Sequence, residues 1–242
     1  MLTFRLDPFS PLLDAIRILS YVAPKANIKS TTSTLTLSVA PPTRRFIGAL
    51  QMLPEFFNFF HSDDTHQSRI PLDLLCIIMD RMELRGFSSM YFAIFQSLSN
   101  VLLTFQEGHE PNVMRELDLL PSEVENIEQI DYGTFVSIDS HDFRRVLLEL
   151  NAYSVHVSVT DSRVKFSTTS EEIVFTKEER RSIIGGLREG EEVKFLITLY
   201  PWVFFHDLSY EAKRAWFFMS NDFSTVIIHF FGIYSQYWVY FP

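Results

Sequence analysis

The residues most suggestive of chemistry form the stretch HSDDTH, His61 to His66, with two histidines and two aspartates in six positions. Imidazole nitrogens and carboxylate oxygens are the donors that zinc and related divalent ions bind in proteins. A loop of this polarity is also an ordinary solvated connection between elements. We predict a solvated polar loop, with metal binding as the alternative, and we expect no metal site and no cofactor.

The remaining reactive or stacking side chains favour packing over catalysis. Cys76 is the only cysteine and lies in the apolar run LLCIIM, so an internal disulfide framework is excluded and an unreactive thiol is expected. Tyr200, Trp202, Phe204 and Phe205 have the character of base-stacking residues, but packing around a short helix is the favoured interpretation. The sequence contains no glycine-rich phosphate loop and no nucleophile motif. We therefore expect a protein that is not an enzyme.

Composition indicates a folded, acidic chain. Its 242 residues are 47% hydrophobic and 21% charged, enough to bury a core in one large domain or two small ones. The formal net charge of -9 argues against general affinity for nucleic acid or anionic membranes, although a local basic surface remains compatible with it. The aromatic stretch 223–242 is interrupted by His229, Gly232 and Gln236, which favours a buried strand pair over a membrane helix. We expect no membrane partner.

The elements that position these residues follow a pattern that is clearest in residues 132–166. Thr134, Val136 and Ile138 alternate with other side chains as in a strand. Ser140 is suited to cap a helix with apolar residues at helical spacing. Two further alternating runs flank Asp161-Ser162, which predicts a hairpin.

Variations of this strand, helix and hairpin unit recur four times. Helices are predicted from Ser10-Pro11, over Ile70–Met82, after Ser140 and over Trp202–Leu208. The acidic stretch 106–130 contains two prolines and no clear period, which is typical of a connector. The predicted fold is α+β, with two similar lobes of antiparallel sheet that carry two helices each: residues 1–110, a connector over 111–131, and residues 132–242. Strands Val101–Phe105 and Ile173–Thr176 are expected at open edges, where two lobes can pair head to tail into a ring.

Several collinear stretches resemble proliferating cell nuclear antigen (PCNA), the eukaryotic sliding clamp. They are MLTFRLDPFSPLLDAI, MRELDL, FVSIDSHDFRRVLLEL, VHVSVTDSRVKFSTTS, EEVKFLITLYPWVFF and the final VYFP. The similarity covers residues 1–40 and 112–242, while 41–111 match mainly in the order of elements. It implies a trimeric ring of six similar lobes whose helices surround duplex DNA. Such a nuclear clamp performs no chemistry and acts as a processivity factor, holding polymerases and repair enzymes on DNA in replication and DNA repair.

The resemblance also implies which side chains face DNA. The family places lysine and arginine on the inward helix faces, where they contact phosphates without reading sequence. By alignment, several of these positions are not basic here: Leu13, Asp14, Ser20, Ile77, Asp80, Leu148 and Asp207. The expected DNA-facing residues are Arg17, Arg81, Arg85, Arg144 and Arg145. We therefore expect non-specific binding of double-stranded DNA through a weakened basic channel.

The resemblance further implies an apolar pocket that receives short peptides of partner enzymes. The aligned positions hold Ala40, Phe46, Val124, Ile127, Val239 and Phe241. These residues are also compatible with plain sheet core. Two alternatives to a homotrimeric clamp stay open. One is a divergent subunit of a heterotrimeric clamp, and the other is a protein-binding adaptor or decoy with weakened or lost DNA encirclement.

Overall fold

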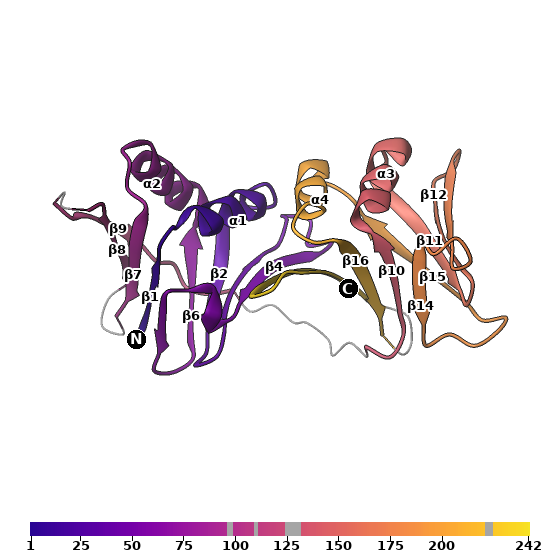
Figure 1. Cartoon of the computed structure of the whole chain (residues 1–242), viewed down its shortest axis with the longest axis horizontal. Coiled ribbons are helices and arrows are strands. Elements are labelled where there is room, and N and C mark those ends of the chain that lie inside the picture. The colour runs from indigo at the N-terminus through magenta and orange to yellow at the C-terminus, as the bar shows by residue number, and fades with distance from the viewer. Residues whose placement is uncertain (96–98, 109–110, 124–131, 221–224) are drawn as a thin grey trace. The chain divides into compact units, whose positions relative to one another are not determined.

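The computed structural model describes residues 1–95, 99–108, 111–123, 132–220 and 225–242 (Figure 1). Within them lie four α-helices and eighteen strands, and every strand pairing with a defined register is antiparallel. This arrangement confirms the predicted α+β class. The chain divides into two compact units, which are Met1–Pro42 with Ala49–Glu125, and Thr43–Gly48 with Asn126–Pro242. We call them unit 1 and unit 2.

Unit 1 contains two helices over antiparallel strands. Its helices are α1 (Ser10–Ser20) and α2 (Leu72–Leu84), and they pack against each other. One sheet has the order β5-β1-β7-β8-β9, and four further strands follow the order β4-β3-β2-β6. The strands are β1 (Leu2–Leu6), β2 (Lys25–Ser30), β3 (Leu35–Val39), β4 (Ile47–Met52), β5 (Phe59–Ser62), β6 (His66–Pro71), β7 (Ser89–Ile94), β8 (Asn100–Gln106) and β9 (Val113–Asp118). Strand β4 crosses the boundary between the units.

Unit 2 repeats this order of elements. Its helices are α3 (Ser140–Leu150) and α4 (Trp202–Leu208). Five strands have the order β14-β10-β16-β17-β18, and a separate sheet has the order β13-β12-β11-β15. The strands are β10 (Phe135–Asp139), β11 (Ser154–Thr160), β12 (Arg163–Ser167), β13 (Glu172–Thr176), β14 (Ser182–Gly185), β15 (Glu192–Thr198), β16 (Arg214–Met219), β17 (Val226–Phe231) and β18 (Ser235–Phe241).

The two units are equivalent element by element. The strands follow the same order in both units, so each strand of unit 1 corresponds to the strand nine numbers later in unit 2, and α1 and α2 correspond to α3 and α4. The registers give residue equivalences, since Phe4 opposes Phe92 in unit 1 as Val136 opposes Phe217 in unit 2. The internal repeat inferred from the sequence is therefore a duplication of a whole two-helix unit.

Each unit has its own core beneath its helices. In unit 1, Phe9 at the start of α1 contacts Phe105 of β8, with ring centroids 5.5 Å apart. In unit 2, Phe143 of α3 contacts Phe217 of β16 and Phe230 of β17 at 6.0 and 5.8 Å. All five rings are buried. The helical spacing of apolar residues in α1 and α3 thus places one face of each helix on a sheet.

The predicted polar loop over His61–His66 is wrong. Strand β5 includes His61 and Ser62, β6 begins at His66, and only residues 63–65 lie between them. Strand β6 then continues through Ile70 and Pro71, so the second helix begins at Leu72. The sequence did not predict these strands because many residues of β5 and β6 are exposed or only partly buried. Such strands lack the alternation of apolar residues that marks a strand with one buried face.

Three other sequence predictions need correction. The connector contains strand β9, which pairs with β8, so Val101–Phe105 is an interior strand. The charged segment 177–192 contains the short strand β14. The residue that caps α3 is Asp139, whose carboxylate accepts a hydrogen bond from the His141 N–H at 2.8 Å, and Ser140 is the first helical residue. Strand β13 does lie at a sheet edge, as expected for Ile173–Thr176.

Candidate functional site

The helix pair of unit 1 holds Arg17 among carboxylates. On α1, Arg17 donates to Asp14 at 2.7 Å, and its second terminal nitrogen contacts Asp80 of α2. Glu83 of α2 lies 3.9 Å from that same nitrogen. The positive charge of Arg17 is therefore offset by three nearby acids. A phosphate group would have to compete with all three.

Arg81 and Arg85 are more accessible. Arg81 is exposed on the last turn of α2, and no ion pair involves it within the part of the chain that the structure describes. Arg85 directly follows the helix, and its guanidinium carbon lies 5.5 Å from the ring centroid of Phe87. Of the five predicted DNA-facing arginines, Arg81 is the one best placed to meet a phosphate.

Arg144 and Arg145 of α3 differ in role. Arg144 donates to the backbone carbonyl of Ser209 at 2.8 Å, and its guanidinium lies 4.3 Å from the ring centroid of Tyr210. It therefore ties α3 to the chain that follows α4. Arg145 donates to Glu149 at 2.8 Å, one turn further along the helix. An exposed pair of this kind is weak, so Arg145 can exchange its partner for a phosphate at low cost.

The helices as a group are acidic. The four helices contain Arg17, Arg81, Arg144 and Arg145 against Asp14, Asp73, Asp80, Glu83, Asp142, Glu149 and Asp207. Asp142 is buried and paired with Arg181, which leaves six accessible carboxylates against four arginines. Non-specific DNA affinity rises with the number of phosphates that a protein neutralises. These helices supply few such contacts.

Some aligned positions are apolar and exposed. Ile77 of α2 and Leu148 of α3 are 45% and 60% exposed, and Leu84 at the end of α2 is 87% exposed. Leu13, by contrast, is fully buried under α1. The alignment puts Leu13 on the accessible helix face, but the structure buries it, and Asp14 and Arg17 form that face of α1 instead.

The four predicted peptide-pocket residues that the structure describes lie in different places. Phe46 and Val239 are fully buried, and the Phe46 ring packs on Phe204, Phe205 and Phe241 with centroids 5.5 to 5.9 Å apart. Gly48 lies against this cluster, because a Cβ there would approach the Phe204 ring to 2.9 Å. Phe46 and Val239 thus belong to the core of unit 2. Val124 and Ile127 lie outside the described residues.

The two other predicted pocket residues line separate depressions. Ala40 belongs to a depression of about 240 Å³ in unit 1, together with Lys25, Asn27, Arg69 and Glu123. Phe241 belongs to one of about 500 Å³ in unit 2. The lining of the unit 2 depression mixes apolar, polar and basic side chains: Arg45, Ser154, Lys194, Phe195, Leu196, Thr198, Val226, Phe241 and Pro242.

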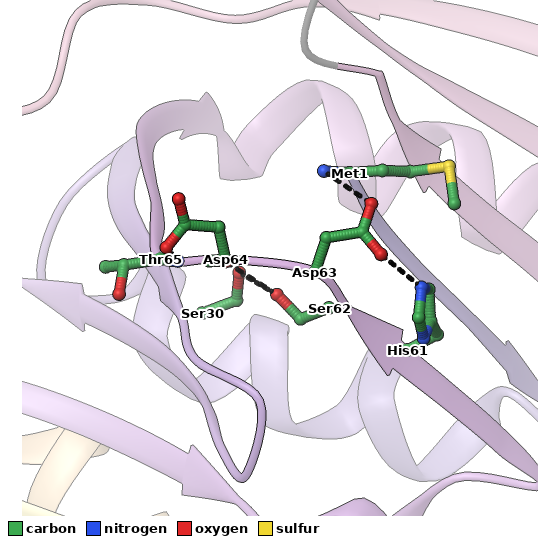
Figure 2. Close-up of polar contacts among 7 residues, drawn as sticks. All are labelled: Met1, Ser30, His61, Ser62, Asp63, Asp64 and Thr65. Carbon is green, nitrogen blue, oxygen red and sulfur yellow. Dashed lines mark hydrogen bonds and ion pairs between the residues drawn. The ribbon is translucent and has the colours of Figure 1, made fainter.

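The histidines and aspartates of His61–His66 do not converge. His61 faces Asp63 while Asp64 points elsewhere (Figure 2), and the His66 ring contacts the Ser68 hydroxyl at 2.8 Å. His61 contacts the Asp63 carboxylate at 2.5 Å, and the amino group of Met1 lies 3.5 Å from it. The hydrogen bond to His61 lowers the pKa of Asp63. Asp64 instead bonds the N–H of Thr65, and no cluster of three metal-ligating side chains exists in the described ranges. Asp63 thus fastens the start of β1 to the end of β5.

The stacking candidates divide between core and surface. Phe204 and Phe205 are buried, as expected for packing around a short helix. Trp202 stacks on His206 of the same helix at 4.5 Å, and exposed Tyr200 stacks on Tyr153 at 5.2 Å. Sequence reasoning missed Arg45, whose guanidinium lies 5.1 Å from the Tyr153 ring centroid. No local pattern could have joined residues so far apart in sequence.

Burial shifts the pKa values of two further side chains, the half-buried Cys76 and the buried His229. Cys76 is a free thiol on α2, and burial raises its pKa to about 11. It is half-buried, so the expected unreactive thiol sits at the rim of the core. His229 of β17 is surrounded by the rings of Tyr132, Phe218 and Phe231, and burial lowers its pKa to about 4.

No protein-family model and no curated protein matches this chain. No helix in the described part of the chain is long and apolar enough to cross a membrane.

Proposed function

We propose that the chain is a subunit of a PCNA-like sliding clamp that encircles duplex DNA and tethers replication and repair enzymes. The observation that carries this proposal is the duplicated unit, in which nine antiparallel strands and two helices recur in one order. A ring around DNA needs repeated lobes that present helices to one side and strand edges to their neighbours. The collinear PCNA resemblance of residues 1–40 and 112–242 supports the same function.

Two sheet edges suit ring closure. Strand β9 ends one sheet of unit 1, and β13 ends the four-stranded sheet of unit 2. Edge strands carry unpaired backbone groups that pair readily with a strand of another chain. Self-association of β9 with β13 of a neighbour would repeat head to tail and close a ring of three chains. Met114 on β9 is 57% exposed and would lie at such an interface.

Solution mass tests the ring. Light scattering should give a mass of three chains, and the single change Val174→Lys on β13 should shift it towards one chain, because an edge lysine opposes strand pairing. The matched change His156→Lys, at an exposed position of the interior strand β11, should leave the mass unchanged. A wild-type mass of one chain at every concentration would remove the homotrimer.

DNA encirclement is tested with linear duplex that carries biotin at both ends. After incubation, streptavidin blocks the ends, and a wash at high salt removes protein that is held only by charge. Encircling protein should stay on the blocked DNA and leave when a restriction enzyme cuts it. Equal release from blocked and open DNA would contradict encirclement.

The arginines are tested in the same assay. Arg81→Glu with Arg145→Glu should reduce retention at low salt and flatten its salt dependence, since each lost phosphate contact lowers the slope. Arg163→Glu with Arg188→Glu changes the net charge equally away from the helices and is the control. Arg144 is left intact because it bonds the Ser209 carbonyl. Equal retention by the two double variants would exclude Arg81 and Arg145 as DNA contacts.

A second candidate function rests on the acidic helices. Four arginines against six accessible carboxylates favour a clamp-fold adaptor with lost DNA encirclement, or a subunit whose partners in a heterotrimer supply the basic residues. A three-chain mass without retention on blocked DNA would favour the adaptor. One-chain mass that rises on addition of a partner subunit would favour the heterotrimer.

A further inference from the structure

The equivalent edge strands β6 and β15 present the same backbone groups outward. In unit 1 the N–H of Leu72 bonds the carbonyl of Pro24 at 2.8 Å, and in unit 2 the N–H of Leu199 bonds that of Tyr153 at 2.9 Å. Bonded and non-bonded pairs alternate along antiparallel strands. Three residues before these anchors, Arg69 and Leu196 therefore both direct N–H and C=O away from the neighbouring strand, towards the open side of the sheet.

In unit 1 these outward groups are satisfied by the segment that follows β9. The N–H of Arg69 bonds the carbonyl of Leu120, and the N–H of Leu120 bonds that of Arg69, both at 2.8 Å. Three residues later, Glu123 forms an ion pair with the Arg69 side chain, and its N–H donates to Asn27 at 3.1 Å. A short extended stretch thus adds to β6 through one backbone bridge and one carboxylate.

In unit 2 the equivalent place on β15 is open. Leu196 is 52% exposed, and among the described residues no strand or isolated bridge pairs with β15 on that side. The depression of about 500 Å³ lies along this edge, with Leu196 and Thr198 on one side and Val226 and Phe241 among its apolar lining. Within the described residues, unit 2 therefore repeats the acceptor strand, and the edge of β15 at Leu196 stays uncovered.

We propose that β15 accepts an extended segment of a partner protein as an added antiparallel strand, with an apolar residue opposite Leu196 and an acidic residue about three positions later. This inference rests on the proposed tethering function, because it names the kind of peptide through which a partner is held. Backbone pairing supplies the affinity in this mode of recognition, and flanking side chains supply the selectivity.

The charges around β15 explain the acidic residue. The depression is lined by Arg45 and Lys194, where unit 1 has Arg69 to hold Glu123. Arg45 lies over the ring of Tyr153, and Lys194 makes an exposed pair with Glu192 at 2.9 Å. Exposed pairs contribute little, so a carboxylate on the peptide can replace Glu192. An apolar residue packs against Phe195, Val226 and Phe241 at the same site.

The test uses the chain's own covering segment as the probe. A dye-labelled peptide with the sequence of residues 115–123, RELDLLPSE, is titrated with the full-length protein and followed by fluorescence anisotropy. Leu196→Pro removes the outward N–H while leaving the bonds to β11 in place, because proline is tolerated where an edge N–H faces solvent. Leu196→Val keeps the N–H and is the matched control.

Leu196→Pro should weaken peptide binding about tenfold or more, and Leu196→Val less than about threefold. A peptide methylated on the backbone nitrogen of its third leucine, which is Leu120, should lose binding to a similar extent. Arg45→Ala and replacement of the final peptide glutamate by glutamine should each weaken binding and should not weaken it further when combined. Unchanged thermal unfolding of Leu196→Pro checks that the fold is intact.

Two results would overturn the proposal. One is equal affinity of wild type and a folded Leu196→Pro variant, and the other is equal affinity for the methylated and unmethylated peptides. DNA retention and solution mass are measured on the same preparations. Peptide binding without DNA retention would defeat the clamp function alone, whereas retention and a three-chain mass without peptide binding would defeat only this inference.

Discussion

Units 1 and 2 share one backbone plan, but the sheet faces that point away from the helices differ in chemistry. In unit 1 the compared positions on β1, β7 and β8 hold one aromatic ring, Tyr91, whereas the equivalent positions of unit 2 hold three aromatic rings and a histidine. By the strand registers, the equivalent positions in units 1 and 2 are Thr3 and Phe135, Tyr91 and Trp216, Ala93 and Phe218, Leu102 and Ile227, and Thr104 and His229. Phe218, Ile227 and Tyr240 form a buried cluster on this face.

Unit 2 thus has a hydrophobic layer on this face, in addition to the core beneath its helices. Trp216, Phe135 and Trp238 pack around the buried cluster, so strands β10, β16, β17 and β18 pack side chains on both faces. Burial of apolar area stabilises in proportion to that area. We expect the outer layer to carry much of the stability of unit 2, whereas unit 1 depends on the core beneath its helices.

Truncation of Phe218 should have the largest effect on the stability of unit 2. Phe218→Ala gives unit 2 the residue that unit 1 has at Ala93, and we expect a loss of about 3 kcal/mol, since it removes a buried ring and leaves a cavity. All three tryptophans, Trp202, Trp216 and Trp238, lie in unit 2, so tryptophan fluorescence during urea unfolding reports that unit alone. Phe231→Ala, at a 45% exposed position, should cost much less. Equal losses of unfolding free energy in Phe218→Ala and Phe231→Ala would contradict a stabilising role of the buried cluster.

Acidification should distinguish the units through His229. Its pKa is lowered to about 4 by burial, below the ordinary value near 6.5, so the folded state favours the neutral ring. This stability is fully present above about pH 6.5 and is lost as pH falls towards 4, by about 3 kcal/mol.

The measurement compares wild type with His229→Phe at several pH values between 4 and 7, by urea unfolding and tryptophan fluorescence. The difference between the two proteins isolates His229 from the carboxylates that both contain. The variant should become the more stable of the two on acidification. Parallel pH curves would contradict the assignment of this titration to His229.

Helix capping should give a smaller difference in stability between the two units. Asp139 caps α3 with its carboxylate, whereas α1 begins after Phe9, which offers no side-chain cap. Asp139→Ala should therefore cost about 1 kcal/mol, and Ser10→Ala in α1 should cost little. Thermal unfolding of both variants checks this. A larger cost for Ser10→Ala would mean that α1 depends on a contact other than a cap.

The sequence predicts the elements with buried faces and misses those without them. The helix and hairpin of residues 140–167 follow from regular apolar spacing, and both are confirmed. Strands β5, β6, β9 and β14 were missed because exposed or polar residues leave them without an apolar alternation. The duplication was visible for the same reason as the helices, since each copy repeats its buried positions.

The candidate sites were harder to predict because they depend on tertiary contacts. From the sequence, Arg17 and Arg144 are expected to be free cations. In the fold, Arg17 donates to Asp80 and Arg144 donates to the Ser209 carbonyl, and both acceptors are far away in sequence. Phe46 and Val239 read as pocket residues, but their rings and methyls fill the core of unit 2. The sequence shows the type of each side chain, whereas only the fold shows which partner each side chain contacts.

The shared spacing between the outward strand position and the first backbone anchor has a consequence for protein engineering. Arg69 precedes Leu72 and Leu196 precedes Leu199 by the same three residues, so the two edges have the same hydrogen-bond phase. A covering segment can therefore be grafted from one edge to the other without a change of register. A chain extended after Pro242 by the residues that follow β9 would carry its own strand for β15, as an internal plug for that edge.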